Sequence, residues 1–138
     1  DMSPIYDQPL SRSNEYASYI IDGIVNGNEI TINANIMNEG YIDNLPSNCC
    51  VEVPCLINAN GFMPQKIGKL PEQLTALMRT NINVQILTAE AALTKKREHI
   101  YHAAMLDPLT GANLTIDEIY DMVDKMIEAH GNYLPKYN

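Results

Sequence analysis

The sequence contains no tryptophan and only one phenylalanine in 138 residues. Its core must therefore be built from aliphatic side chains, methionine and tyrosine, and the seven methionines are flexible enough to fill irregular gaps. Apolar residues make up 46% of the chain. A chain of this length and composition can bury one core but is too short for two full-sized domains. We expect residues 1–138 to form a single domain.

Positive charge is scarce as well. Nine lysines and arginines stand against seventeen aspartates and glutamates, and the formal net charge is -8. The largest basic cluster is Lys95-Lys96-Arg97, which is too small to provide the basic face that binding to phosphate groups requires. We therefore expect neither nucleic acid nor an anionic membrane as a partner.

Long apolar runs are absent too. The run from Tyr19 to Ile21 breaks at Asp22, far short of a bilayer span, and the chain does not open with the charged and then apolar pattern of a secretion signal. This favours a cytoplasmic location. The polar opening from Asp1 to Pro9 contains two prolines and no initial methionine, which is typical of a linker or of a cut inside a longer chain. We expect a fragment.

The glycine motifs of nucleotide-binding proteins are missing. The seven glycines never form G-x-G-x-x-G or G-x-x-x-x-G-K, so the chain has no recognisable phosphate cradle of its own. The nucleophile motif G-x-S-x-G is absent. The sequence by itself therefore indicates no cofactor-binding residue and no catalytic residue.

The sequence does contain a series of strand signals. They follow a first helix, which should end at Asn26-Gly27 because apolar residues recur at helical spacing up to that point. Alternation over residues 29–37 predicts a half-buried strand, and residues 49–57 predict a second strand with Pro54 at an edge or bulge. The turn at residues 58–61 sends the chain back, so we expect residues 65–68 to pair as a short return strand.

Helix signals follow from Leu70 onward. Residues 80–83 have weak helix propensity, so the helix there either becomes irregular or keeps polar side chains for a purpose. A further helix is expected over residues 98–105, and Thr115-Ile-Asp-Glu118 is a capping box that starts a last helix ending at Gly131. Strands first and helices afterwards predict an α+β fold, with a small sheet of mostly antiparallel strands packed with helices.

All three cysteines fall in the stretch Asn48-Cys-Cys-Val-Glu-Val-Pro-Cys55. In an extended strand Cys49 and Cys50 point to opposite faces, while Cys49 and Cys55 lie about 20 Å apart at about 3.3 Å per residue. Neither a disulfide nor a shared metal ion fits that geometry. We interpret the cysteines as packing thiols in a buried strand, with a local metal site as the less favoured alternative.

The three histidines suggest no metal site either. His99 and His102 lie three residues apart on a predicted helix and could share one face, as metal-binding pairs do, but no third ligand stands at a matching spacing. We interpret them as part of a partly solvated helix face. His130 falls in the last turn of the final helix, where a favourable interaction with the helix dipole is the simpler interpretation.

Three blocks of sequence carry a family resemblance. They are Arg12-Ser-Asn-Glu-Tyr-Ala-Ser; then Asn38-Glu-Gly-Tyr-Ile-Asp-Asn-Leu-Pro with Cys50-Val-Glu-Val-Pro-Cys; then Arg79-Thr-Asn-Ile-Asn-Val-Gln, followed by Glu90-Ala-Ala-Leu-Thr and Tyr101-His-Ala-Ala-Met-Leu-Asp-Pro-Leu. In this order they resemble the C-terminal region of the family 4 glycosidases, and among these the α-galactosidase branch. The likeness covers residues 12–135.

The resemblance implies that the chain is the C-terminal domain of a longer enzyme with the lactate and malate dehydrogenase fold, whose N-terminal Rossmann domain is absent from this sequence. Such enzymes use NAD and a divalent metal, usually Mn²⁺, and cleave glycosidic bonds by oxidation and elimination instead of with two carboxylates. The family's nucleotide fingerprint, metal ligands and catalytic base precede the part present here. The resemblance thus implies a homo-oligomeric parent enzyme that acts on α-galactosides, and a fragment with no activity of its own.

By the same resemblance, Arg12, Asn38, Asn44 and Asn81 are expected to support substrate binding, because polar side chains at a strand end or in a weak helical turn can line a sugar pocket. The simpler interpretation of each is a cap or turn side chain. Two alternatives to this function stay open. The first is that the domain is a purely structural or oligomerisation module. The second is that the parent enzyme acts on 6-phosphoglycosides or galacturonides. The few cations of this chain give little support to a phosphate pocket.

Overall fold

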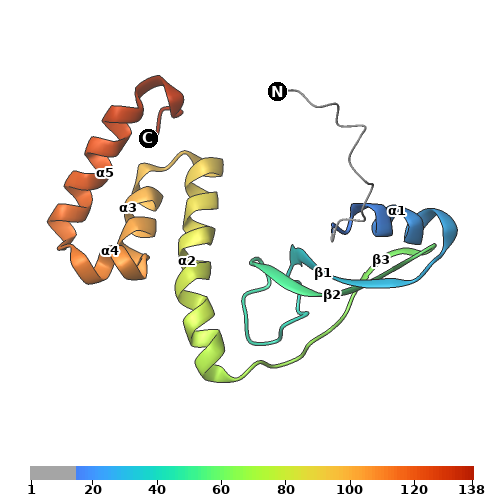
Figure 1. The fold of residues 1–138 in the computed structure, drawn as a ribbon. Helices are drawn as coiled ribbons and strands as arrows, with labels where there is room; N and C mark the ends of the chain where they lie inside the picture. The colour runs from blue at the N-terminus through green and yellow to red at the C-terminus, as the bar shows by residue number, and fades with distance from the viewer. Residues whose placement is uncertain (1–14) are drawn as a thin grey trace, which may run out of the picture. The chain divides into compact units, whose positions relative to one another are not determined.

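A computed structural model describes residues 15–138, so Arg12 lies outside the described residues. Its elements in chain order are α1 (Ala17–Asn26), β1 (Ile30–Met37), β2 (Cys50–Asn58), β3 (Gly61–Pro64), α2 (Glu72–Thr94), α3 (Arg97–Leu106), α4 (Pro108–Asn113), α5 (Ile116–His130) and the short 3-10 helix η2 (Gly131–Tyr133) (Figure 1). The strands form one antiparallel sheet in the order β1-β2-β3. The predicted α+β fold is confirmed.

The described chain divides into two compact units. The first combines the described part of Asp1–Ala34 with Val53–Gln65, and the second combines Asn35–Glu52 with Lys66–Asn138. Each unit is described below by itself, and membership of a single domain stays a prediction. No helix in residues 15–138 has both the length and the apolar character needed to cross a membrane.

In the first unit, helix α1 packs against strand β2 through a glycine. Gly23 is buried, and a Cβ atom placed on it would lie 3.0 Å from the Asn28 carbonyl oxygen and 3.2 Å from Cγ2 of Ile57. The absence of a side chain therefore lets the helix backbone cover Ile57. Complete burial of such a side chain stabilises the fold by about 1.5–3 kcal/mol. Gly27 ends the helix with a φ of +77°, as predicted.

The hairpin of the first unit turns back earlier than the sequence predicted. Strand β2 pairs with β3 from Asn58↔Gly61 to Cys55↔Pro64, so the predicted return strand at residues 65–68 was wrong. The reason is local. Gly61 has a φ of +100°, which residues with a side chain rarely adopt, and it allows pairing to begin directly after the turn.

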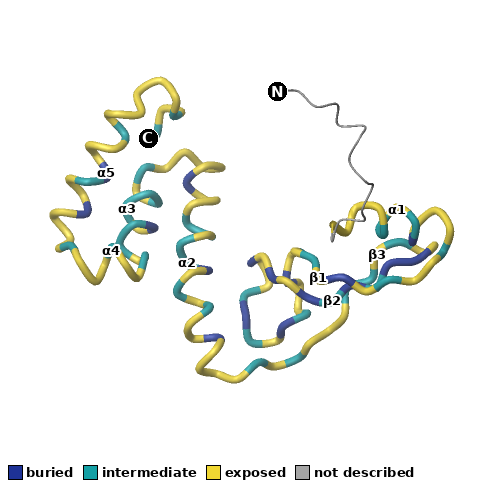
Figure 2. Tube along the Cα trace, viewed as in Figure 1, coloured by how far each residue is buried: buried dark blue, intermediate teal, exposed yellow. Residues whose placement is uncertain are grey.

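The predicted alternation of strands β1 and β2 is confirmed. Figure 2 colours the chain by burial and shows β2 as a largely buried strand. Its residues Val51, Val53, Cys55 and Ile57 are buried, whereas Cys50 and Glu52 are exposed. Strand β1 shows the same period. Ile32 is buried and Ile30, Ala34 and Ile36 are half-buried, whereas Asn33 and Asn35 between them are exposed. A period of two was sufficient to assign both strands and their faces.

In the second unit, helix α3 lies between α2 and α5 (Figure 1). Helix α2 runs without interruption through residues 80–83, so the irregular alternative did not occur. The Thr80 hydroxyl donates to the Leu77 carbonyl at 2.7 Å, and Arg79 Nε donates to Asn83 Oδ1 at 3.0 Å. These bonds place the polar groups of the weak segment within the helix itself.

Two features of this helical unit were not predicted. Helix α4 follows directly on α3, because Pro108 occupies its first turn and the Asp107 carboxylate accepts a hydrogen bond from the Thr110 N–H at 2.8 Å. The last residue of the chain also pairs with the junction of α2 and α3. Asn138 accepts from the Arg97 N–H at 2.9 Å and donates to the Lys95 carbonyl at 2.8 Å, which fixes Lys95 at a φ of +57°.

The capping box that starts α5 is confirmed. The Thr115 hydroxyl accepts from the Glu118 N–H at 3.4 Å, and the Glu118 carboxylate accepts from the Thr115 N–H at 2.8 Å. The hydrogen bonds from Thr115 hold the pKa of Glu118 below its usual value, because they favour the charged carboxylate.

Loss of this box should destabilise the chain in a pH-dependent way. We expect Thr115→Ala to lower the free energy of unfolding at neutral pH by about 1 kcal/mol. Since the folded pKa of Glu118 is lowered, its stabilisation is present above the usual pKa of about 4.3 and disappears as the pH falls through the lower folded value. Glu118→Gln should therefore lose stability at neutral pH and match the unaltered chain in acid.

Urea unfolding at neutral pH and at about pH 3 measures both effects. Asp117→Asn is the matched control, since Asp117 lies in the same first turn and takes no part in the box. A stability difference between Glu118→Gln and the unaltered chain that stays the same at the two pH values would contradict this account.

Candidate functional site

The site begins with Asn38, whose side chain is completely buried. Its Nδ2 donates toward the carbonyl oxygens of Ile42, Leu45 and Pro46 at 3.0, 3.1 and 3.0 Å, and its Oδ1 accepts from the Ile42 N–H at 2.7 Å. An asparagine offers two N–H donors and one carbonyl acceptor, so both ends of this amide are engaged by main chain. Asn38 shapes the loop of residues 38–46 and presents no accessible group to a ligand.

The loop held by Asn38 contains strained backbone. Glu39 has a φ of +40° and Gly40 a φ of +93°, and positive φ is costly for a residue with a side chain. Two further bonds hold this turn, from the Glu39 N–H to the Ser47 carbonyl at 3.0 Å and from the Tyr41 N–H to the Asn38 carbonyl at 2.7 Å. The surrounding hydrogen bonds therefore fix a conformation that Glu39 would not adopt alone.

The same loop fixes the point at which α2 begins. The Asp43 N–H donates to the Gly68 carbonyl at 2.9 Å. Asn44 then pairs with the main chain of Leu70 at both ends of its amide, accepting from the N–H at 3.0 Å and donating to the carbonyl at 2.8 Å. Helix α2 starts two residues later at Glu72, so its first turns lie beside the loop.

Two hollows lie between the loop and one stripe of α2. The first has a volume of about 230 Å³ and is lined by Asn44, Glu72, Thr75, Ala76 and Arg79. The second has a volume of about 390 Å³ and is lined by Pro46, Asn48, Arg79, Asn83, Ile86, Leu87 and Leu106. Arg79 lines both hollows. The sequence analysis placed Arg79 in a family motif but did not select it as a site residue. The signal was available, because residues seven apart on a helix, such as Glu72 and Arg79, lie on the same face.

The structure does not bring all the predicted site residues together. Asn44 lines the first hollow, and Asn38 positions the loop that carries Asn44. Asn81 is exposed and lines neither hollow; two residues beyond Arg79, it points about 200° away around the helix. A contact of Asn81 with substrate stays a prediction, as does one of Arg12.

The cysteines lie where the strand pattern placed them. All three are free, with Cys49 and Cys55 buried and Cys50 exposed. Burial raises the pKa of the Cys49 and Cys55 thiols, and the nearby Arg79 guanidinium only partly opposes the rise at Cys49. Both buried thiols are therefore neutral, and their burial confirms the interpretation of Cys49 and Cys55 as packing groups, whereas Cys50 is exposed and does not pack in the core.

A cluster of titratable groups joins α3 to α5. Arg97 donates to the Tyr101 hydroxyl and to Asp124 Oδ1, each at 2.7 Å, and the Tyr101 hydroxyl donates to the same carboxylate oxygen. Burial and the bond to Asp124 raise the pKa of Tyr101, while the bonds from Tyr101 and Arg97 lower the pKa of Asp124. The phenol thus stays protonated and the carboxylate charged, an arrangement suited to holding two helices together.

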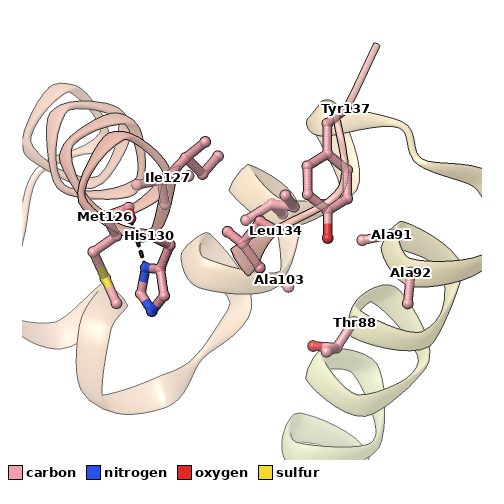
Figure 3. A pocket seen from close by; sticks show the side chains of 11 residues that line it. Thr88, Ala91, Ala92, Ala103, Met126, Ile127, His130, Leu134 and Tyr137 are labelled. Atoms are coloured by element: carbon pink, nitrogen blue, oxygen red, sulfur yellow. Dashed lines mark hydrogen bonds between the residues drawn. The ribbon is translucent and has the colours of Figure 1, made fainter. Parts of the chain in front are cut away.

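An apolar cavity of about 290 Å³ lies beside the C-terminal residues (Figure 3). Its lining is aliphatic apart from Met126, Thr88, His130 and Tyr137. His130 Nδ1 lies 2.6 Å from the Met126 carbonyl oxygen, which can only accept, so Nδ1 carries the proton. This bond agrees with the predicted role of His130 at a helix C-terminus, and the cavity supplies packing surface more than chemistry.

Residues 15–138 contain no group of three or more His, Cys, Asp or Glu side chains placed to hold a metal, and the His99 and His102 rings stand 6.5 Å apart at their centroids. No glycine-rich phosphate turn occurs in the sequence. What the two hollows beside α2 offer is a surface with one arginine and several amides.

Comparison with known proteins decides the family. The model described as "Family 4 glycosyl hydrolase C-terminal domain" matches residues 2–110. The chain belongs to this family. Membership of family 4 confirms the resemblance predicted from the sequence blocks.

Curated family 4 relatives include two α-galactosidases. The protein of Bacillus subtilis (strain 168) is 48% identical over 126 residues, which cover 91% of this chain and 29% of the relative. That of Rhizobium meliloti (strain 1021) is 34% identical over 130 residues, covering 94% of this chain and 26% of the relative. The chain is therefore homologous to α-galactosidases and spans less than a third of their length.

A solved family 4 structure shows the same fold. It is a 6-phospho-alpha-glucosidase from gut microorganisms, crystallised in complex with NAD and Mn²⁺. The match has a TM-score of 0.82 at 19% identity and covers 100% of this chain and 31% of the other. This likeness concerns the fold alone, and it confirms the expected C-terminal architecture.

Replacing Asn38 should destabilise the second unit strongly. We expect Asn38→Ala to lower the free energy of unfolding by about 2–3 kcal/mol, because it leaves buried carbonyl oxygens and the Ile42 N–H without partners. Asn38→Asp should cost more, since a carboxylate would face three carbonyl oxygens. Urea unfolding measures both, with the exposed strand residue Asn35→Ala as control. Equal stabilities of the Asn38 and Asn35 variants would refute this role.

Proposed function

We propose that the protein containing this domain is an NAD- and Mn²⁺-dependent α-galactosidase, and that the domain supplies part of the surface that holds the sugar. The observation that carries the proposal is the 48% identity to an α-galactosidase over 91% of the chain. Relatives named as 6-phospho-glucosidases or as an α-galacturonidase reach only 28–30%. The difference favours an uncharged galactoside over the two anionic alternatives.

The described residues support a positioning role in this reaction. NAD, when bound by the parent protein, supplies the redox chemistry. The task of this domain is then to hold the sugar in one orientation, which lowers the entropic part of the activation barrier. Asn44 is fixed at Leu70 by two hydrogen bonds and keeps one amide N–H and one lone pair free to meet a hydroxyl group.

We also propose that the parent protein is cytoplasmic and homo-oligomeric. Three free cysteines, one of them exposed, support a reducing compartment. The exposed large apolar side chains of the helical unit support a further subunit or domain contact; they include Leu77, Leu93, Leu109 and Ile116.

Removal of each cofactor from the full-length protein tests the proposed function. We expect hydrolysis of p-nitrophenyl α-galactoside by the complete protein with NAD⁺, Mn²⁺ and a reductant, and a loss of turnover of at least about 100-fold after chelation or NAD⁺ depletion. Restoring each cofactor should restore the rate. The 138-residue chain should show no turnover under any of these conditions, since its described residues fit neither cofactor.

Two results would contradict the proposal. Turnover that survives removal of both cofactors would assign the reaction to a different mechanism. Turnover of 6-phosphoglycosides or galacturonides, with none of the neutral galactoside, would keep the family chemistry and change the substrate.

A further inference from the structure

Arg79 is the arginine of the described region that forms no ion pair there. Lys95 and Lys136 form none either, whereas Lys66, Lys69, Lys96, Arg97 and Lys125 each lie within 4.0 Å of a carboxylate. The one hydrogen bond of the Arg79 guanidinium in that region runs from Nε to Asn83 Oδ1 at 3.0 Å. An arginine has five N–H donors, so the four donors of the terminal nitrogens remain available on a side chain that lines both hollows.

The hydrogen bond to Asn83 gives the guanidinium a defined direction. Asn83 lies one helical turn further along the same stripe of α2 and also lines the second hollow. A guanidinium group whose Nε is already hydrogen-bonded loses less conformational entropy when it binds a ligand, because its rotation is partly restricted in the free protein. Arg79 is thus prepared for recognition by a contact that plays no part in the fold of the loop.

The charge of the first hollow favours a neutral ligand. Among the residues that line this hollow, Arg79 is the one cation and Glu72 the one carboxylate. The carboxylate of Glu72 is mostly exposed, and its contact with Lys69 is long, at 3.9 Å. A phosphate group would gain from the arginine and be repelled by the glutamate, whereas hydroxyl groups can donate to Glu72 and accept from Arg79.

The hollows also differ in polarity along α2. The first is bounded by amide, hydroxyl and charged groups, while the second adds an aliphatic wall from Pro46, Ile86, Leu87 and Leu106. A sugar has hydroxyl groups on its edges and C–H groups on its faces, so the aliphatic wall suits a ring face and the polar hollow suits ring hydroxyls. Since Arg79 borders both, a ligand of two sugar units would contact it from either hollow.

We propose that Arg79 is a substrate-binding residue, and that it orients an uncharged glycoside in the hollows it lines by donating a pair of hydrogen bonds to the hydroxyl groups of the sugar. The inference rests on the proposed function, because it takes an α-galactoside as the ligand. Beyond that function, it assigns substrate binding to Arg79 and predicts that a glycoside with a second sugar unit binds more tightly than one with a single sugar.

Kinetics of Arg79 variants in the full-length protein test the inference. With NAD⁺ and Mn²⁺ present, Arg79→Gln should raise KM for the galactosyl disaccharide melibiose by about 10- to 100-fold, as expected for two lost charge-assisted hydrogen bonds. The kcat should change by less than about threefold, because the bonds form equally in the bound ground state and the transition state. Methyl α-galactoside, which has no second sugar, should show a smaller rise in KM.

Three comparison variants make the result specific. Arg79→Lys keeps the charge and loses the planar fork, so its KM should fall between those of Arg79→Gln and the unaltered protein. Asn83→Ala removes the hydrogen bond that directs Nε and should raise KM only severalfold. Lys136→Gln removes an exposed positive charge from the C-terminal residues and should leave KM unchanged. Thermal unfolding of each variant reports any loss of folding.

Failure of this inference differs from failure of the proposed function. If the unaltered protein hydrolyses the galactosides with both cofactors while Arg79→Gln matches it in KM, the role of Arg79 is overturned and the function stands. A KM effect limited to anionic glycosides would also overturn it. If the unaltered protein neither binds melibiose in calorimetry nor hydrolyses it, both the inference and the proposed function fall.

Discussion

The amide of Asn38 is the constraint on which the second unit depends. It is buried and bonded to main chain at both ends, so it fixes the loop of residues 38–46, including the strained turn at Glu39. The loop then holds Leu70 through Asn44, and Leu70 leads into α2. One buried side chain thereby determines where the stripe of α2 that carries Arg79 meets the loop.

A polar group at the centre of such a unit gives it a single arrangement. An aliphatic residue at position 38 would fill the volume but would leave the loop carbonyls and the Ile42 N–H without partners. Aspartate has the same shape as asparagine but lacks the amide N–H groups that donate to the loop carbonyls. Glutamine is longer by one methylene group, which would have to fit into a site with no exposed surface. Asparagine satisfies both the main-chain donor and the acceptors, so the loop has one low-energy conformation.

Local patterns in the sequence were sufficient for most of the elements, but not for β3, for α4 or for the assembly. The strands followed from a period of two, and the start of α5 followed from Thr115 and Glu118 because a capping box is contained within four residues. The return strand was placed too late although its cause, the positive φ of Gly61, is local, whereas the position of Arg79 depends on contacts between distant segments. Sequence motifs singled out Asn38 as a substrate-binding residue, a role that stays a prediction, whereas its burial, and hence its positioning role in the loop, was visible only in three dimensions.

The described residues contain no group of three or more His, Cys, Asp or Glu side chains placed to hold a metal, yet on the proposed function the domain would still influence which glycoside reacts. Oxidation and elimination, the proposed chemistry, require the reacting carbons of the sugar to be placed correctly, so the groups that orient the sugar would contribute to selectivity. Asn44 is held at Leu70, and Arg79 is directed by Asn83. Because these bonds lie in the loop and in α2, a specificity that depends on the two residues would be set by the fold of this domain and not by the cofactor.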